Sequence, residues 1–104
     1  MTRILLIDDM RSNYNESVIA RSYWEGIKCL QALGSWDKLL LDHDLASFDD
    51  DGKEFTGYDI LLFLEENPWL APKEIEMVSS NSSIYTKCTQ AITSIMKRRK
   101  EFLV

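Results

Sequence analysis

Arg3-Ile4-Leu5-Leu6-Ile7-Asp8-Asp9 is the stretch that decides the fold, because an uninterrupted aliphatic run stops abruptly at two carboxylates. A strand with one face in water would alternate apolar and polar side chains, and this run does not alternate. It predicts a strand buried on both faces, as the strands of parallel sheets flanked by helices are. The segment Lys38-Leu39-Leu40-Leu41-Asp42 repeats the design, with an aliphatic strand that ends in a carboxylate.

The segments around these two strands predict the rest of an α/β fold. Residues 18–21 predict a weak second strand and residues 75–79 a further one, while Ser22 with Glu25 and Thr56 with Asp59 have capping-box spacing at helix starts. A long amphipathic helix is expected from residue 83 onward. Alternating strands and helices favour a small α/β fold with a mostly parallel sheet of about four strands flanked by helices.

One connection is unusual. The segment between the first two strands is short for a parallel crossover, so either a reduced helix lies there or the second strand is misplaced.

Length, charge and cysteine content narrow the class of protein. The chain has 104 residues, 45% hydrophobic and 28% charged, which predicts one folded domain over residues 1–104. Twelve Lys and Arg against 17 Asp and Glu give a net charge of -5, which argues against a general nucleic-acid coat. No apolar stretch is long enough to span a bilayer, no signal peptide is recognisable, and the two cysteines lack metal-ligand neighbours. We therefore expect a cytoplasmic protein without a membrane partner.

Polar side chains follow three of the predicted strands, where ligand sites of open α/β sheets lie. The residues concerned are Asp8 and Asp9 after the first strand, Asp42, His43 and Asp44 after the third, and Ser79, Ser80 and Asn81 after the fourth. A cluster of carboxylates is commonly held by a hard divalent cation such as Mg²⁺, which would in turn anchor a phosphoryl group. The alternative is that these acids only solvate the strand ends.

These residues resemble a known family. Asp8-Asp9-Met10-Arg11, Leu41-Asp42-His43-Asp44-Leu45, Thr56-Gly57-Tyr58-Asp59 and Ser79-Ser80-Asn81 are similar to the DDER-like, LDHDL, TGYD and HSxN-like segments of the cyclic-phosphate-processing receiver-like family. That family is related to the receiver domain of response regulators, a flavodoxin-like fold that would here be truncated. The resemblance runs from Arg3 to about Met96.

The resemblance implies a role for each matched residue. Asp8, Asp9 and Asp42 would bind Mg²⁺ or Mn²⁺, and Asp42 also matches the phosphoacceptor of receivers. Arg11 and Ser79 would bind phosphate. Asp42, His43 and Asp44 would form the catalytic set, with His43 or Asp44 handling the proton. The implied function is that of a receiver-like domain with a divalent-metal site that processes or binds a cyclic or terminal phosphate on a nucleotide or RNA end. A metal-dependent cyclic-phosphate phosphoesterase is the enzyme that this function would imply.

Two departures from the family pattern keep a second hypothesis open. The family has a histidine where this chain has Val78, and His43 is the single histidine of the sequence. We also find no fifth strand ending in the lysine that conventional receivers use. The alternative is a degenerate receiver-like module that binds a protein partner or a nucleotide without turnover. Strand alternation would place His43 on the face opposite Asp42 and Asp44, so a structural role for this histidine is an equal alternative.

Three further features receive structural interpretations. The polar segment 46–55 is expected to be a loop that forms a flexible lid beside the site or a solvated surface segment. The basic run 97–100 is favoured as a complement to the helix dipole over a nucleic-acid contact. The tryptophans are favoured as packing residues at the rim of the core over base-stacking platforms; they are Trp24, Trp36 and Trp69.

Overall fold

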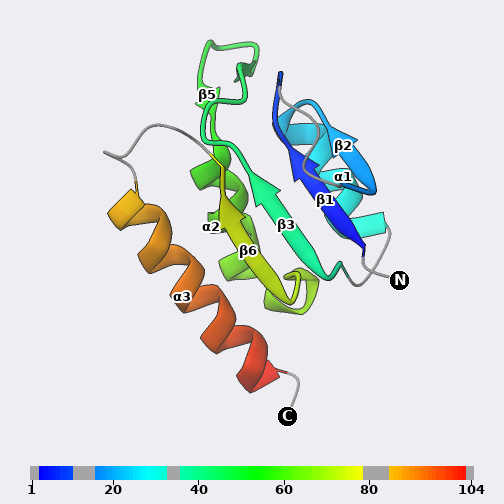
Figure 1. The fold of residues 1–104 in the computed structure, drawn as a ribbon. Coiled ribbons are helices and arrows are strands. Elements are labelled where there is room, and N and C mark those ends of the chain that lie inside the picture. Colours follow the sequence, from blue (N-terminus) through cyan, green and yellow to red (C-terminus); the bar gives the residue numbers. More distant parts are fainter. Residues whose placement is uncertain (1–2, 11–15, 33–35, 79–84, 103–104) are drawn as a thin grey trace.

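The computed structural model describes residues 3–10, 16–32, 36–78 and 85–102 (Figure 1). In chain order its elements are β1 (Ile4–Ile7), β2 (Val18–Ala20), α1 (Tyr23–Ala32), β3 (Lys38–Leu41), β4 (Ser47–Phe48), β5 (Glu54–Phe55), α2 (Gly57–Glu66), the 3₁₀ turn η1 (Pro68–Leu70), β6 (Glu74–Met77) and α3 (Tyr85–Phe102).

The main sheet has the order β2-β1-β3-β6, and every neighbouring pair is parallel. The two aliphatic strands β1 and β3 occupy its centre, in agreement with their continuous apolar sequences. The register pairs Ile7 with Leu41 and Leu41 with Met77, so the carboxyl ends of three strands meet at one edge. The predicted small α/β fold with about four parallel strands is confirmed.

The short crossover between β1 and β2 is real. Ile7 pairs with Ala20 in parallel register, and the Ser17 amide donates to the Ile4 carbonyl at 2.8 Å. The weak second strand is therefore correctly placed. Of the connecting segment, residues 8–10 and 16–17 form no helix, and residues 11–15 lie outside the described part of the chain.

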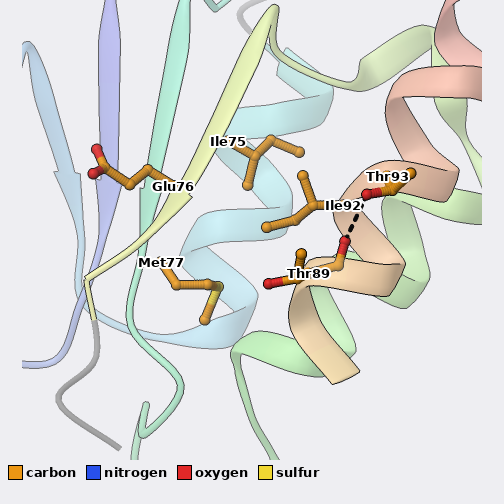
Figure 2. A pocket seen from close by; sticks show the side chains of 6 residues that line it. All are labelled: Ile75, Glu76, Met77, Thr89, Ile92 and Thr93. Atoms are coloured by element: carbon orange, nitrogen blue, oxygen red, sulfur yellow. Dashed lines mark hydrogen bonds between the residues drawn. The ribbon is translucent and has the colours of Figure 1, made fainter. Parts of the chain in front are cut away.

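The three helices lie on the same face of the sheet. Figure 2 shows the strands edge-on with ribbons of the helices on one side of them. Alternate strand residues, Leu5, Ile7, Leu39, Leu41 and Ile75, share one core cluster with apolar residues of α1, α2 and α3. Leu6 and Leu40 are also buried but belong to the opposite face, on which no described helix packs. The sheet is thus flanked by described helices on one side only, whereas the sequence had suggested cover on both.

The polar segment 46–55 forms a hairpin, which corrects its interpretation as a loop, while residues 50–54 are exposed, as expected for a solvated surface segment. Antiparallel β4 and β5 enclose a turn in which one Asp49 carboxylate oxygen accepts the Asp51 amide at 2.9 Å and the Lys53 amide at 2.8 Å. Gly52 has φ of +82°, a left-handed conformation that a glycine adopts without strain. The acidic side chain at the start of the turn therefore organises the backbone.

The tryptophans divide into one core residue and two surface residues. Trp36 is fully buried, donates its indole N–H to the Cys29 carbonyl at 3.2 Å and lies under the Arg3 guanidinium. The placement of Trp36 at the rim of the core was therefore wrong. Trp24 and Trp69 are about half exposed, in keeping with the rim.

Both cysteines are free thiols, as predicted, and Cys88 is buried in the core. Desolvation by burial raises the pKa of the Cys88 thiol. None of the helices in the described ranges combines the length and the apolar content needed to cross a membrane.

The basic run at the end of α3 serves the fold. Arg99 donates through Nε to the Ala71 carbonyl at 3.1 Å, and Arg98 donates through Nη1 to the Glu65 carbonyl at 3.4 Å. Two of the four cations therefore bind backbone oxygens next to or within α2 and η1. These contacts give Arg98 and Arg99 a structural role that differs from the predicted complement to the helix dipole.

Candidate functional site

Three carboxylates converge at the carboxyl end of the sheet. One oxygen from each of Asp8, Asp9 and Asp42 lies within 4.8 Å of the other two. Asp8 and Asp42 are buried and Asp9 is half-buried. In the part of the chain that the structure describes, this is the one such group of metal-ligating side chains. The predicted convergence of the two strand ends is therefore observed.

The backbone of the central strands fixes these acids. The Asp42 amide donates to the Ile7 carbonyl at 2.9 Å, and the Asp8 amide donates to the Ala20 carbonyl at 3.0 Å, so the parallel ladder continues through both residues. The Met10 amide then donates to Asp8 Oδ1 at 2.9 Å, which turns the chain directly after the strand. The positions of the carboxylates thus follow from the pairing of β1 with its two neighbours.

A hard divalent cation fits this donor set. Carboxylate oxygens are the ligands that Mg²⁺ and Mn²⁺ prefer, and Mg²⁺ sites in proteins keep several waters beside one or two carboxylates. Three like charges within 4.8 Å repel one another, and a divalent cation between them converts that repulsion into attraction. Asp9, the most exposed of the three, leaves the group reachable from solvent.

The start of α2 is built against the backbone of this site. The Gly57 amide donates to the His43 carbonyl at 2.8 Å, and a Cβ atom at position 57 would lie only 2.2 Å from the Asp42 carbonyl oxygen. Only glycine tolerates this approach, since a real Cβ would collide with backbone. The sequence predicted the helix start here but missed this role, and the signal was the glycine directly after the capping threonine.

A complete capping box holds the same helix start. The Thr56 hydroxyl accepts from the Tyr58 amide at 3.2 Å, and the Asp59 carboxylate accepts from the Thr56 amide at 2.8 Å. The box satisfies amide groups that the first turn of a helix leaves without intrahelical partners. The predicted pairing of Thr56 with Asp59 is confirmed, and it fixes α2 against the end of β3.

His43 and Asp44 contact each other and are not members of the three-carboxylate group. His43 Nδ1 lies 3.2 Å from Asp44 Oδ1. The histidine side chain is 20% exposed and the aspartate side chain 71% exposed. A tautomer with its proton on Nδ1 donates to Asp44 and leaves Nε2 available to accept or deliver a proton. The contact is compatible with either of the two roles weighed for His43.

Of the remaining residues at the site, the predicted ones lie outside the described part of the chain, and one that was not predicted lies within it. Arg11 and Ser79, the predicted phosphate ligands, lie outside the described residues, as do Ser80 and Asn81. Arg21 was not predicted, yet its Nη1 donates to the Asp8 carbonyl at 3.3 Å and so brings a guanidinium beside the acidic group. The signal for Arg21 was its position directly after the second strand, where the other strand ends carry their polar residues.

Comparison with known proteins gives one match. A family model described as the cyclic-phosphate processing receiver domain matches residues 3–94 of this chain. The match includes the three carboxylates, the helix start at Gly57 and most of α3. No curated protein and no solved structure matches the chain.

Proposed function

The chain belongs to the cyclic-phosphate processing receiver domain family, and from this premise we propose that it binds and processes a cyclic or terminal phosphate on a nucleotide or RNA end. The observation that carries the proposal is the group formed by Asp8, Asp9 and Asp42, whose carboxylate oxygens lie within 4.8 Å of one another. We propose that these three side chains hold Mg²⁺ or Mn²⁺. When bound, the cation supplies positive charge that neutralises the phosphoryl oxygens.

The other residues position the phosphate and move the proton. Arg11 is proposed to bind phosphate oxygens through two parallel hydrogen bonds, which a guanidinium makes and an ammonium does not. Ser79 is proposed to donate its hydroxyl to a further oxygen. His43, held by Asp44 at 3.2 Å, is proposed to carry the proton through Nε2.

The proposed reaction is hydrolysis of a cyclic phosphodiester. The oxygen of one water bonds to phosphorus, one of the two ring P–O bonds breaks, and the leaving sugar oxygen takes a proton. The products are a phosphomonoester and a free hydroxyl, so the reaction consumes one water and needs no other reactant. His43 accepts the proton of the attacking water and returns it to the leaving oxygen.

Turnover of a 2',3'-cyclic nucleotide with Mg²⁺ tests the enzyme. We expect hydrolysis by the wild type and background rates for Asp42→Asn, since this substitution removes one charge from the acidic group. Asp50→Asn is the matched control, because it removes an exposed carboxylate from the hairpin turn and should leave turnover unchanged. His43→Gln should lower kcat with little change in KM. Background turnover by the wild type would remove the enzymatic claim.

A binding module without turnover is the second candidate. Val78, which stands where the family has a histidine, continues the strand by donating its amide to the Leu41 carbonyl at 2.9 Å and supplies no acid or base at that position. Titration with Mg²⁺ and a 2',3'-cyclic nucleotide, followed by NMR, distinguishes the candidates. Shifts at Asp8 and Asp42 without product identify a binding module, and shifts with product identify the enzyme. In either case we place the protein in the cytoplasm, where free thiols such as Cys29 and Cys88 persist.

A further inference from the structure

Among the described residues, the last strand of the sheet has one edge that pairs with no other strand. β6 is terminal in the order β2-β1-β3-β6, and no other strand among the described residues pairs with it. The Val78 amide donates to the Leu41 carbonyl of β3, so Ile75 and Met77, which alternate with it, direct their amides and carbonyls to the other side. An edge of this kind is a template for an added strand.

A groove runs along this edge. β6 and α3 line a cavity of about 310 Å³, to which β6 contributes Ile75, Glu76 and Met77. Figure 2 shows the side chains of Ile75, Met77 and Ile92 directed into it. Thr89 and Thr93 line the helix side, where the Thr93 hydroxyl donates to the Thr89 carbonyl at 3.0 Å. The volume is at the lower end of the range of ligand cavities. The groove can therefore receive apolar side chains from a strand laid beside β6.

The opposite face of the same strand is acidic. In Figure 2 Glu76 points away from α3. The side chains of Glu74 and Glu76 are 68% and 58% exposed, and Lys38 Nζ lies 4.0 Å and 3.0 Å from their carboxylates. One lysine thus lies within ion-pair distance of two glutamates, which leaves the three side chains with a net negative charge. A strand added at this edge meets apolar residues on one face and net negative charge on the other.

From this juxtaposition we propose that the β6 edge binds an extended segment of a partner polypeptide in which apolar residues alternate with Lys or Arg. The backbone of the segment bonds to Ile75 and Met77, its apolar side chains enter the groove beside α3, and its cations face Glu74 and Glu76. This mode of recognition takes affinity from main-chain hydrogen bonds and specificity from alternate side chains.

The charges disfavour a second copy of the chain at this edge. A two-fold axis perpendicular to the sheet would continue the acidic face into the acidic face of the copy, and like charges directly across two strands are destabilising. A segment in which basic residues alternate with apolar ones would instead place opposite charges directly across the two strands. None of the residues assigned to this surface is among those proposed to bind the metal or the phosphate, so this inference can be tested independently of the proposed phosphate chemistry.

Synthetic octapeptides provide the test on the full chain. One alternates Val and Lys, a second has the same composition with four Val followed by four Lys, and a third alternates Val and Glu. We expect the alternating Val-Lys peptide to slow amide hydrogen exchange of Ile75 and Met77 by at least about tenfold. The block-ordered peptide and the Val-Glu peptide should leave both amides unchanged.

Two variants sharpen the result. Met77→Pro removes an amide that points away from β3, a position where edge strands tolerate proline, and should abolish binding. Glu74→Lys with Glu76→Lys should weaken the Val-Lys peptide by about tenfold and make the Val-Glu peptide the better ligand. Asp50→Lys with Glu54→Lys, exposed residues of the hairpin segment, is the control of equal charge and should leave binding unchanged. The charge exchange decides the matter if the proline variant fails to fold.

Three results would overturn the proposal. The block-ordered peptide could bind as tightly as the alternating one, which would show mere charge attraction. The Val-Lys peptide could shift the NMR signals of Asp8 and Asp9 while amide exchange of Ile75 and Met77 stays unchanged, which would place the peptide at the carboxylate group. Sedimentation could show a dimer whose formation protects Ile75 and Met77, which would make a second copy the occupant.

Discussion

The two ends of the parallel sheet use carboxylates in opposite ways. At the carboxyl end, Asp8, Asp9 and Asp42 crowd within 4.8 Å of one another. At the amino end, Asp37 accepts the Arg3 amide at 2.7 Å through one oxygen and lies 3.2 Å from Lys73 Nζ through the other. The first arrangement suits a cation, while the second ties the starts of three strands together. The same residue type therefore serves ligand binding at one end and stability at the other.

A substitution that displaces the backbone at the carboxyl end of the sheet should have the largest effect on stability. Gly57→Ala places a Cβ 2.2 Å from the Asp42 carbonyl, so backbone must move, and we expect a loss of about 3 kcal/mol in the free energy of unfolding. Gly52→Ala is the matched control. Its Cβ meets open space and its cost is the left-handed φ alone, about 1 kcal/mol. Urea unfolding of both variants measures the difference, and equal losses would show that the contact with Asp42 is not tight.

The second largest effect should be a difference in how much Mg²⁺ stabilises variants of the two ends. A ligand at 100 times its Kd adds about 2.7 kcal/mol to the stability of the folded state. We expect thermal unfolding to show this increment in the wild type and in Asp37→Asn, and to lose it in Asp42→Asn. An undiminished increment in Asp42→Asn would place the cation elsewhere.

Neutralising one carboxylate at each end should shift stability in opposite directions. Without metal, Asp9→Asn relieves repulsion from Asp8 and Asp42 and should raise Tm by a small amount. Asp37→Asn removes the contact with Lys73 and weakens the acceptor for the Arg3 amide, so it should lower Tm. Calorimetry in a chelating buffer measures both variants. Shifts of the same sign would contradict the contrast between the ends.

The smallest effect is a pH dependence at the amino end. The hydrogen bond from the Arg3 amide, with a further contribution from Lys73, holds the pKa of Asp37 below its usual value. A depressed pKa stabilises the folded state above the unfolded pKa of about 3.9, and the contribution is lost as pH falls through the folded value. The Tm difference between wild type and Asp37→Asn should therefore be full at pH 6 and shrink below pH 4. A difference that stays constant down to pH 2 would exclude this linkage.

The sequence predicted the centre of the molecule because the signals there are local. Continuous aliphatic runs identified β1 and β3, and parallel pairing of their ends brings Asp8 to Asp42 without further information. Thr56 and Asp59 likewise marked the helix start through their spacing.

What the sequence did not predict depends on tertiary contacts. An aliphatic strand implies burial of both faces but does not say what covers each, so the placement of the helices on one face was missed. The hairpin has strands of two residues, too short for a periodic signal, and its turn depends on one Asp49 side chain. Gly57 was interpreted only as part of a helix start, because the nearness of the Asp42 carbonyl appears only in three dimensions.

The close approach of Gly57 to the end of β3 also determines how this part of the protein opens. The Gly57 amide is bonded to His43 and the Asp42 amide to Ile7, so α2 cannot leave the sheet without uncovering the backbone that holds Asp42. Local unfolding proceeds in cooperative units of this kind. The acidic group and the first turn of α2 thus form one such unit, so the amide protons of residues 42 and 57 should exchange with solvent at a common rate. A cation bound to the acidic group should then slow the exchange of the Gly57 amide in α2 as well.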